Sequence, residues 1–270
     1  MNRRPPDLVL ENLRVRYSAK CTVAGKGTQV DELRLTIIEC LSDQVTIRAL
    51  FSELLQELLI NIGPSKTTEA TISERLKNLA ELFRALSLPA RRTLLGLWGE
   101  LIAILALGSS ESVVASWRND PHDRFDFLRG RHAVEVKATG GPDRVHRFRL
   151  EQVRTTGITC AIASIIAREH VSGISVIELA RQIAEEIKDA IVVRSFWRRV
   201  FEVGANGLEH DDEQRFDLNS SLQSLRFFNA EDVPVPSLIP AGVSNVRFDA
   251  DCGLVQQSLE AQIITGRLTS

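Results

Sequence analysis

The stretch "DRFDFLRGRHAVEVKAT", residues 123–139, decides how the whole chain is interpreted. It predicts two short strands, "RFDFL" and "HAVEVKAT", joined by a tight turn at "RGRH". The first strand carries Asp126, and the second carries Glu135 and Lys137. These charges either coat a solvated hairpin face or meet at a site with metal-dependent chemistry, and the register of the strands bears on that choice.

The register depends on the length of the turn. Because side chains alternate between the faces of a strand, Glu135 and Lys137 share one face. An even-length loop, either residues 129–130 or residues 129–132, puts Asp126 on that face too. In the four-residue version Asp126 lies directly opposite Glu135, whereas an odd-length loop sends it to the far face.

The apolar residues of the hairpin favour the even loop. Gly130 supplies the positive φ that a tight turn needs. Apolar side chains flank the charges on both strands. Only the even register puts them all on one buried face, and they are Phe125, Phe127, Val134 and Val136. The sequence therefore predicts that Asp126, Glu135 and Lys137 converge on the other face.

Such a convergence has a specific chemistry. Two carboxylates a few ångströms apart repel each other unless a positive charge lies between them. Mg²⁺ prefers one or two carboxylates, several waters and a substrate phosphate as its ligands. A neighbouring lysine can hold a water or stabilise charge on the phosphate, so the three groups would position a metal-activated water for in-line attack on a phosphodiester.

Other ligands in this stretch fit less well. Asp123 competes with Asp126, but alternation along the strand puts it on the opposite face. His122 and His132 raise the alternative of a zinc site with Asp123. No pair among them has zinc-motif spacing, and His132 falls in the turn or on the face opposite Glu135.

Hydrophobic periodicity organises the rest of the chain. It predicts strands at residues 8–18 and 32–40, a helix ended by Gly63-Pro64, a helix at about residues 71–86 that Pro89 breaks, and a helix over "RRTLLGLWGELIAILAL" that ends at Gly108. Further strands are predicted at "SVVASW", "RVHRFRL", the apolar "GITCAIASIIAREH", "SLRFFNAEDVPVP" and "VSNVRFDAD", with a helix over residues 175–200. Strands flanked by helices indicate an α/β or α+β fold.

Composition sets outer bounds. The chain has 270 residues, of which 44% are hydrophobic and 25% charged, with a net charge of -2, so a generally basic surface is excluded. The four cysteines are scattered without a CxxC pair, which favours a reducing cytoplasm. The N-terminus lacks the apolar core of a signal peptide, and the apolar run at residues 101–107 is too short to span a membrane.

A local excess of basic residues surrounds the hairpin. Residues 124–154 contain eight lysines and arginines against four acidic residues. Candidate contacts to nucleic-acid phosphates in this segment are Arg144, His146, Arg147 and Arg149. The alternative is an edge strand that carries charge against aggregation. "FWRRV", residues 196–200, could extend the patch, but an amphipathic helix with a buried tryptophan explains it more simply.

At this point the sequence resembles a family. Asp126 followed by "EVK", residues 135–137, after a helix that bears Glu100, resembles the PD-(D/E)xK phosphodiesterase superfamily, the fold of many restriction endonucleases. "GLWGELIAILAL", "FDFLRGRHAVEVKAT", "HRFRLEQV" and "SLRFFNAEDVP" resemble a bacterial PD-(D/E)xK motif protein family whose members lie beside restriction and anti-phage genes. The resemblance covers most of the chain, from about Arg92 to Asp249, and is weaker in the N-terminal part.

The resemblance implies roles for individual residues. Asp126 and Glu135 would be metal ligands, and Lys137 the cation that polarises water or phosphate. Glu100 would be a further acidic ligand on the preceding helix, where Gly96 and Gly99 permit close packing, although a solvent-facing glutamate is the alternative. Gln152 would orient the lysine or contact DNA, or else be a surface glutamine. Phe125 stands where the full motif has proline.

The resemblance also implies a fold and a function. The fold would be a restriction-endonuclease-like mixed central sheet flanked by helices over residues 89–270, with an N-terminal strand-and-helix extension over residues 1–88. The function would be Mg²⁺-dependent hydrolysis of DNA, with Mn²⁺ as a substitute, within a restriction or anti-phage system that supplies partner proteins. Whether the chain forms a homodimer stays open.

Two alternatives come from other classes. The chain could be a nuclease-fold subunit that serves a partner ATPase or methyltransferase through docking at residues 41–88. Two-carboxylate glycoside hydrolysis gives Lys137 no role, and aromatic residues, which bind sugars, make up only 6% of the chain.

Overall fold

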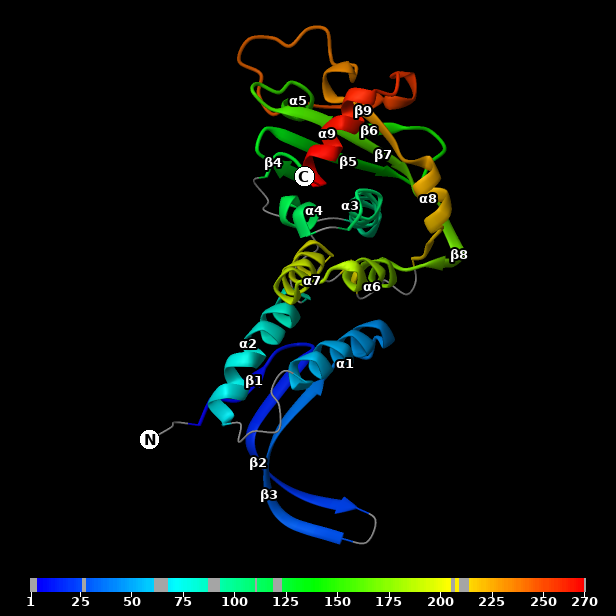
Figure 1. The fold of residues 1–270 in the computed structure, drawn as a ribbon. Coiled ribbons are helices and arrows are strands. Elements are labelled where there is room, and N and C mark those ends of the chain that lie inside the picture. The colour runs from blue at the N-terminus through cyan, green and yellow to red at the C-terminus, as the bar shows by residue number, and fades with distance from the viewer. Residues whose placement is uncertain are drawn as a thin grey trace. The chain divides into compact units, whose positions relative to one another are not determined.

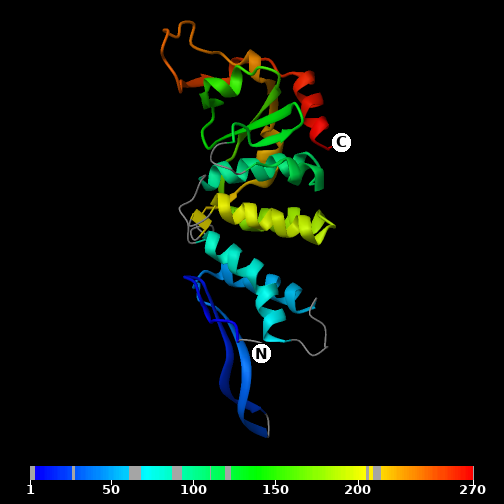
Figure 2. The same ribbon diagram turned by 90° about the vertical axis from the view of Figure 1, so that its left-hand side faces the viewer.

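The computed structural model describes residues 4–25, 28–60, 68–86, 93–109, 111–118, 123–204, 207–208 and 214–269 (Figures 1 and 2). The chain divides into two compact units, Met1–Pro89 and Ala90–Ser270. The sequence-based division between residues 88 and 89, the helix stops at Gly63-Pro64 and Pro89, and His122 all lie outside the described residues.

The first unit joins an antiparallel sheet to two helices. Its strand order is β1-β2-β3, with β1 at Leu8–Val9, β2 at Leu13–Gly25 and β3 at Thr28–Cys40, followed by helices α1 at Val45–Ile60 and α2 at Glu69–Leu86. Leu13, Val15 and Tyr17 of β2 are buried. The rings of Phe51 on α1 and Phe83 on α2 meet edge to face with centroids 5.8 Å apart.

Both long strands of this unit differ from the prediction. The first predicted strand, residues 8–18, is divided between β1 and β2, and both β2 and β3 run farther toward the hairpin tip than expected. Their ladder shifts register between Arg16 and Ala19 and again between Cys21 and Val23. Each shift interrupts the two-residue alternation of side chains. The alternation of apolar and polar residues therefore stops marking the strand in the sequence, although the backbone pairing continues.

The second unit is built on a mixed four-stranded sheet of order β4-β5-β7-β9. Its strands are β4 at Phe127–Arg129, β5 at His132–Thr139, β7 at Thr159–Ile166 and β9 at Arg226–Asn229. β4 and β5 are antiparallel, β5 and β7 are parallel, and β7 and β9 are antiparallel. The apolar β7 lies inside the sheet, as its near-continuous hydrophobic run predicts.

Helices cover the sheet on the side of Val136 and Ala138. Helix α3, Leu94–Ala106, packs on β5 there, and a Cβ added at Gly99 would lie 2.8 Å from the Ala138 Cβ. The predicted close approach at Gly99 is therefore present. Helices α6, Val176–Glu186, and α7, Ala190–Gly204, pack on α3, while α9, Leu259–Thr269, lies across β5, β7 and β9 (Figure 1).

The opposite face of the sheet meets a second, two-stranded sheet. This sheet pairs β6, Val145–Arg149, with β10, Arg247–Asp251, and β6 leads into the short helix α5, Leu150–Val153. Between the two sheets lies an apolar cluster that includes Ala133, Phe148, Ile162, Phe228 and Ala250. The remaining elements are β8 at Glu169–Ile174, α8 at Leu218–Ser224, and short 3-10 helices at Ala230–Asp232 and Cys252–Leu254.

Three predicted elements of this unit are wrong in type or extent. "SVVASW" forms helix α4, Glu111–Ser116, instead of a strand, because a short apolar run fits a buried helix as well as a strand. The single helix predicted over residues 175–200 is two helices, α6 and α7. The predicted strand "GITCAIASIIAREH" likewise ends at Ile166, and Glu169 begins β8.

Candidate functional site

The hairpin has the register that the four-residue loop predicts. Phe127 pairs with Val134, Leu128 with Ala133, and Arg129 with His132. The last pair shortens the loop itself to Gly130 and Arg131, and the φ of Gly130 is +59°, as in a type II′ hairpin turn. The even loop is confirmed, and the ladder ends at Phe127, one residue after Asp126.

One part of the predicted face is wrong. Phe127, Val134 and Val136 are buried, but Phe125 belongs to the apolar cluster on the face of the sheet that bears Ala133 and Glu135. Strand β4 begins only at Phe127, and the backbone bends just before it. Strand alternation therefore does not extend to residues 124–126, and Phe125 turns toward the other side of the sheet.

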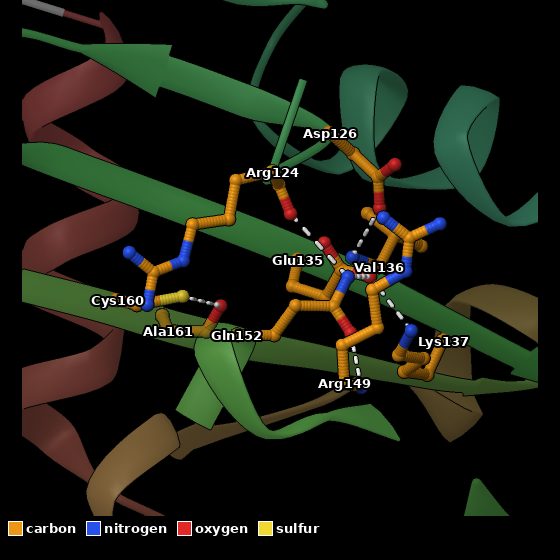
Figure 3. A network of polar contacts seen from close by, with 9 residues as sticks. All are labelled: Arg124, Asp126, Glu135, Val136, Lys137, Arg149, Gln152, Cys160 and Ala161. Atoms are coloured by element: carbon orange, nitrogen blue, oxygen red, sulfur yellow. Dashed lines mark hydrogen bonds and ion pairs between the residues drawn. The ribbon is translucent and has the colours of Figure 1, made fainter. Parts of the chain in front are cut away.

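Asp126 occupies the bend at the open edge of β5. Its side chain is 2% exposed, and its Oδ2 accepts a hydrogen bond of 2.8 Å from the backbone N–H of Val136 (Figure 3). Its own carbonyl accepts from the N–H of Arg118 at 2.7 Å. Asp126 thus binds the backbone N–H of Val136, the residue between Glu135 and Lys137. This contact fixes the Asp126 carboxylate next to the strand position that carries them.

Glu135 is the centre of a side-chain network. It is 2% exposed, and its Oε1 accepts from Lys137 Nζ and from Gln152 Nε2, both at 2.6 Å (Figure 3). Gln152 is fixed in turn, because its Oε1 accepts from the backbone N–H of Arg149 at 2.9 Å. Gln152 lies at the start of α5, directly after β6, so a buried glutamine joins the motif glutamate and lysine.

Glu100 is held in another way. It is 2% exposed within the apolar helix α3, and its Oε2 accepts a hydrogen bond of 2.7 Å from the indole N–H of Trp117. The solvent-facing alternative for Glu100 is therefore wrong. Among residues that the structure describes, no group of three or more acidic, histidine or cysteine side chains has a metal-binding arrangement, so Glu100 as a third ligand stays a prediction.

Sequence comparison identifies a family for this chain. Residues 10–252 match the family described as "Putative PD-(D/E)XK family member, (DUF4420)". The chain belongs to this family. The match spans both units, and the fold of this PD-(D/E)XK chain is α/β with a mixed sheet and flanking helices, as in restriction endonucleases. No curated protein and no solved structure matches the chain.

The donor set of the PD-(D/E)XK chain fits a hard divalent cation. Asp126 and Glu135 supply carboxylate oxygens, which Mg²⁺ and Mn²⁺ favour, and both side chains are buried beside strand β5. One oxygen of each carboxylate is already oriented by a hydrogen bond, Oδ2 of Asp126 by Val136 and Oε1 of Glu135 by Lys137 and Gln152. Asp123, the competing acid, is exposed.

The predicted nucleic-acid contacts fall into two groups. Arg147 and Arg149 are exposed on β6, and Arg147 forms an ion pair of 3.0 Å with Asp249. Arg144 and His146 instead point toward the sheet, where Arg144 donates to the Ser164 hydroxyl at 2.9 Å and His146 Nε2 lies 2.7 Å from the same oxygen. His146 is only 4% exposed.

The surroundings of His146 determine its charge. Burial, together with the positive charges of Lys137 and Arg144, lowers the pKa of His146 to about 4, and Asp251 has a smaller opposing effect. His146 is therefore neutral at neutral pH, and it contributes a hydrogen-bonding ring rather than a charge to this side of the sheet.

Sequence reasoning missed two residues of the site region. Ser164 is a fully buried polar residue in the otherwise apolar β7, and that contrast was its one visible signal. Trp117 holds Glu100, but its segment was interpreted as a strand, which concealed the contact.

In the described part of the chain, no helix is long and apolar enough to cross a membrane.

Proposed function

We propose that this chain is a metal-dependent nuclease that hydrolyses DNA phosphodiester bonds, with Mg²⁺ as its cofactor and Mn²⁺ as a substitute. The observation that carries the proposal is the network around Glu135. The buried Glu135 carboxylate accepts hydrogen bonds from both Lys137 and Gln152, and a second carboxylate, that of Asp126, is fixed nearby on the Val136 N–H. Burying these charged groups costs desolvation free energy, so a contribution to stability alone does not explain them.

Each side chain has a role in this proposal. Asp126 and Glu135 would hold the metal ion, which when bound supplies a more acidic water and neutralises charge on the phosphate. Lys137 donates to the attacking water or to a phosphate oxygen, since its ammonium already lies at this spot beside Glu135. Gln152 orients the Glu135 carboxylate, and the burial of the network excludes bulk water from it.

DNA as the substrate and bacterial defence as the setting are the finer parts of the proposal. They are supported by the resemblance to proteins encoded beside restriction and anti-phage genes and by the basic residues 124–154. Arg147 and Arg149 are exposed and could contact phosphates, which supply much of the affinity for nucleic acid. We place the protein in the cytoplasm with partner proteins from the same operon.

The direct test uses purified protein, plasmid DNA and Mg²⁺ or Mn²⁺. Asp126→Ala and Lys137→Ala should abolish cutting and nicking while circular dichroism shows an intact fold. Glu186→Gln is a matched control, because Glu186 is exposed at the end of α6. If both site variants cut as fast as the wild type, the site assignment is wrong.

The second candidate is an inactive nuclease-fold subunit of a larger assembly. It is favoured by one observation, which is that every candidate site residue lies in the unit Ala90–Ser270, so the unit Met1–Pro89 is available for another task. Residues 41–88 would then dock a partner ATPase or methyltransferase. Normal phage defence by the Asp126→Ala variant, with no cleavage even when partners are present, would favour this candidate.

A further inference from the structure

A second polar group lies on the same sheet face as the candidate active site. Lys137 on β5 pairs with Ser164 on β7, and Ser164 pairs with Arg226 on β9. Register partners on neighbouring strands share a face, so the three residues form one row across the sheet. The adjacent row on this face contains Glu135, which places the two rows about 7 Å apart, the length of two strand residues.

A second arginine reaches this row from the loop before β6. Arg144 donates to the backbone oxygen of Ser164 at 2.8 Å, to its hydroxyl at 2.9 Å, and to the backbone oxygen of Ser224. Ser164 is fully buried, and its hydroxyl also contacts His146. These neutral oxygens fix the Arg144 guanidinium in place without neutralising its charge.

Arg226 is fixed in the same manner. Its Nη1 donates to the backbone oxygens of Gln223 and Leu225 at 2.8 and 2.9 Å. Within the described part of the chain, neither Arg144 nor Arg226 has a carboxylate within ion-pair distance. Arg144 donates to the carbonyl of Ser224, and Arg226 donates to the carbonyls on either side of it, those of Gln223 and Leu225, so both guanidinium groups bind the same short segment. Burial lowers the pKa of Arg144, and the positive charge of Arg226 lowers it as well.

Two arginines held side by side by neutral oxygens repel each other, and a bound anion would offset that repulsion. A guanidinium has five N–H groups, and the contacts above use three on Arg144 and two on Arg226. The remaining donors suit the oxygens of a phosphate, which arginine binds in a forked geometry. Because both groups are already fixed, little conformational entropy is lost on binding.

We propose that Arg144 and Arg226 form a binding site for a backbone phosphate of the nucleic-acid substrate, one row along the sheet from the carboxylate of Glu135. The site would hold a phosphate beside the one that is cleaved and so align the strand with Lys137. The assignment of a nucleic acid as the source of the phosphate rests on the proposed nuclease function, whereas the phosphate site itself does not.

The first experiment measures DNA binding without cleavage. Affinity for a short DNA duplex is followed by fluorescence anisotropy in EDTA at several salt concentrations. Arg226→Gln should weaken binding several-fold for all sequences and lower the slope of log K against log salt by about one, as the loss of one phosphate contact requires. Arg226→Lys should keep the slope, since it keeps the charge.

A matched control removes the same charge elsewhere. Arg194→Gln changes an exposed arginine on α7 and should leave affinity and slope near the wild-type values. Arg226 is well suited as the test position because, among the described residues, its hydrogen bonds reach only the neighbouring carbonyls of Gln223 and Leu225. If Arg226→Gln and Arg194→Gln bind DNA with equal affinity and slope, a DNA phosphate site at Arg226 is ruled out.

The second experiment separates the site from the nuclease function. Inorganic phosphate should raise the Tm of the wild type above that in chloride of equal ionic strength, and Arg226→Gln should lose this increase. A wild type that neither binds nor cuts DNA but keeps the Arg226-dependent increase would retain the site, with a free phosphate compound as its ligand, and would remove the nuclease function. Loss of both effects would overturn the inference.

Discussion

At the residue scale, the site depends on contacts that convert a sequence pattern into a fixed geometry. A lysine two residues after a glutamate occurs by chance on many strands, but here Gln152 joins the pair from a separate element and is itself held by the Arg149 backbone. A surface hairpin has no such third partner. Gln152 therefore distinguishes the candidate site from a solvated charged face more sharply than the motif does.

Removing this partner gives the first prediction. Gln152→Leu should slow DNA cleavage by roughly 10- to 100-fold and raise the Mg²⁺ concentration needed for half-maximal rate, because Glu135 loses an orienting donor. A Mg²⁺ titration of the cleavage rate measures both effects. Gln256→Leu, at an exposed position, is the matched control. An unchanged Mg²⁺ dependence in Gln152→Leu would show that Gln152 does not orient a metal ligand.

His146 gives a prediction about pH. Its pKa is about 4 in the folded protein and about 6.5 when unfolded, so between these values the unfolded state binds more protons. The free energy of unfolding should therefore fall as pH decreases from about 6.5 to about 4, by on the order of 2–3 kcal/mol from this residue.

His146→Gln cannot gain this charge and should flatten the stability profile in the same range. Urea unfolding at a series of pH values measures it. The exposed His170, changed to Gln, is the control and should leave the profile of the wild type. A profile as steep in His146→Gln as in the wild type would assign the pH dependence to other groups.

At the element scale, the sequence predicted what depends on local pattern. The hairpin register followed from the apolar alternation of β5 and the glycine of the turn, and the central position of β7 followed from its apolar run. The predictions that were wrong concern positions whose structure depends on contacts distant in the sequence. Phe125 turns away because β4 begins late, and "SVVASW" is helical because a short buried run carries no decisive period.

The site was predictable to the same limited degree. Alternation alone placed Glu135 beside Lys137, and the contact between them is present. Ser164 and Arg226 are far from the motif in sequence and approach it only through the parallel pairing of β5 with β7 and the pairing of β7 with β9. No local pattern encodes the order of strands in a sheet, so these neighbours required the structure.

The packing of α3 on β5 gives a prediction for an element. Gly99→Ala would place a Cβ 2.8 Å from that of Ala138 and 3.3 Å from Val136 Cγ1, both on the strand that carries Glu135. We expect a loss of roughly 1–3 kcal/mol in unfolding free energy, since the helix must move away from the sheet.

The control for this change lies on another helix. Gly266→Ala in α9 meets nothing within 4 Å and should stabilise the protein by up to about 1 kcal/mol through helix propensity. Thermal and urea unfolding of both variants measure the difference. Equal stability of Gly99→Ala and the wild type would mean that α3 can shift at no cost.

At the scale of the whole molecule, the chain is two units with one candidate site. The residues Glu100, Asp126, Glu135, Lys137 and Gln152 all belong to Ala90–Ser270. If Met1–Pro89 serves partner binding, the two tasks are separable. We expect residues 90–270 alone to remain folded and to keep metal-dependent cleavage of plasmid DNA, and to lose phage defence in cells that carry the rest of the operon.

The measurements for this prediction are circular dichroism and plasmid cleavage for the fragment, and plaque counts for the cells. The fragment with Lys137→Ala is the control for contaminating nucleases. A folded fragment without cleavage would show that cleavage also requires the unit Met1–Pro89.

The strand order of the main sheet also bears on the synthesis of the protein. A ribosome would release the β4–β5 hairpin long before β9, at Arg226–Asn229, and α9, at Leu259–Thr269, which packs across β5, β7 and β9. Until those late segments emerge, the sheet lacks one strand and one of its covering helices. If the chain is the proposed nuclease, it would thus be unable to cut the DNA of its own cell until translation was nearly finished.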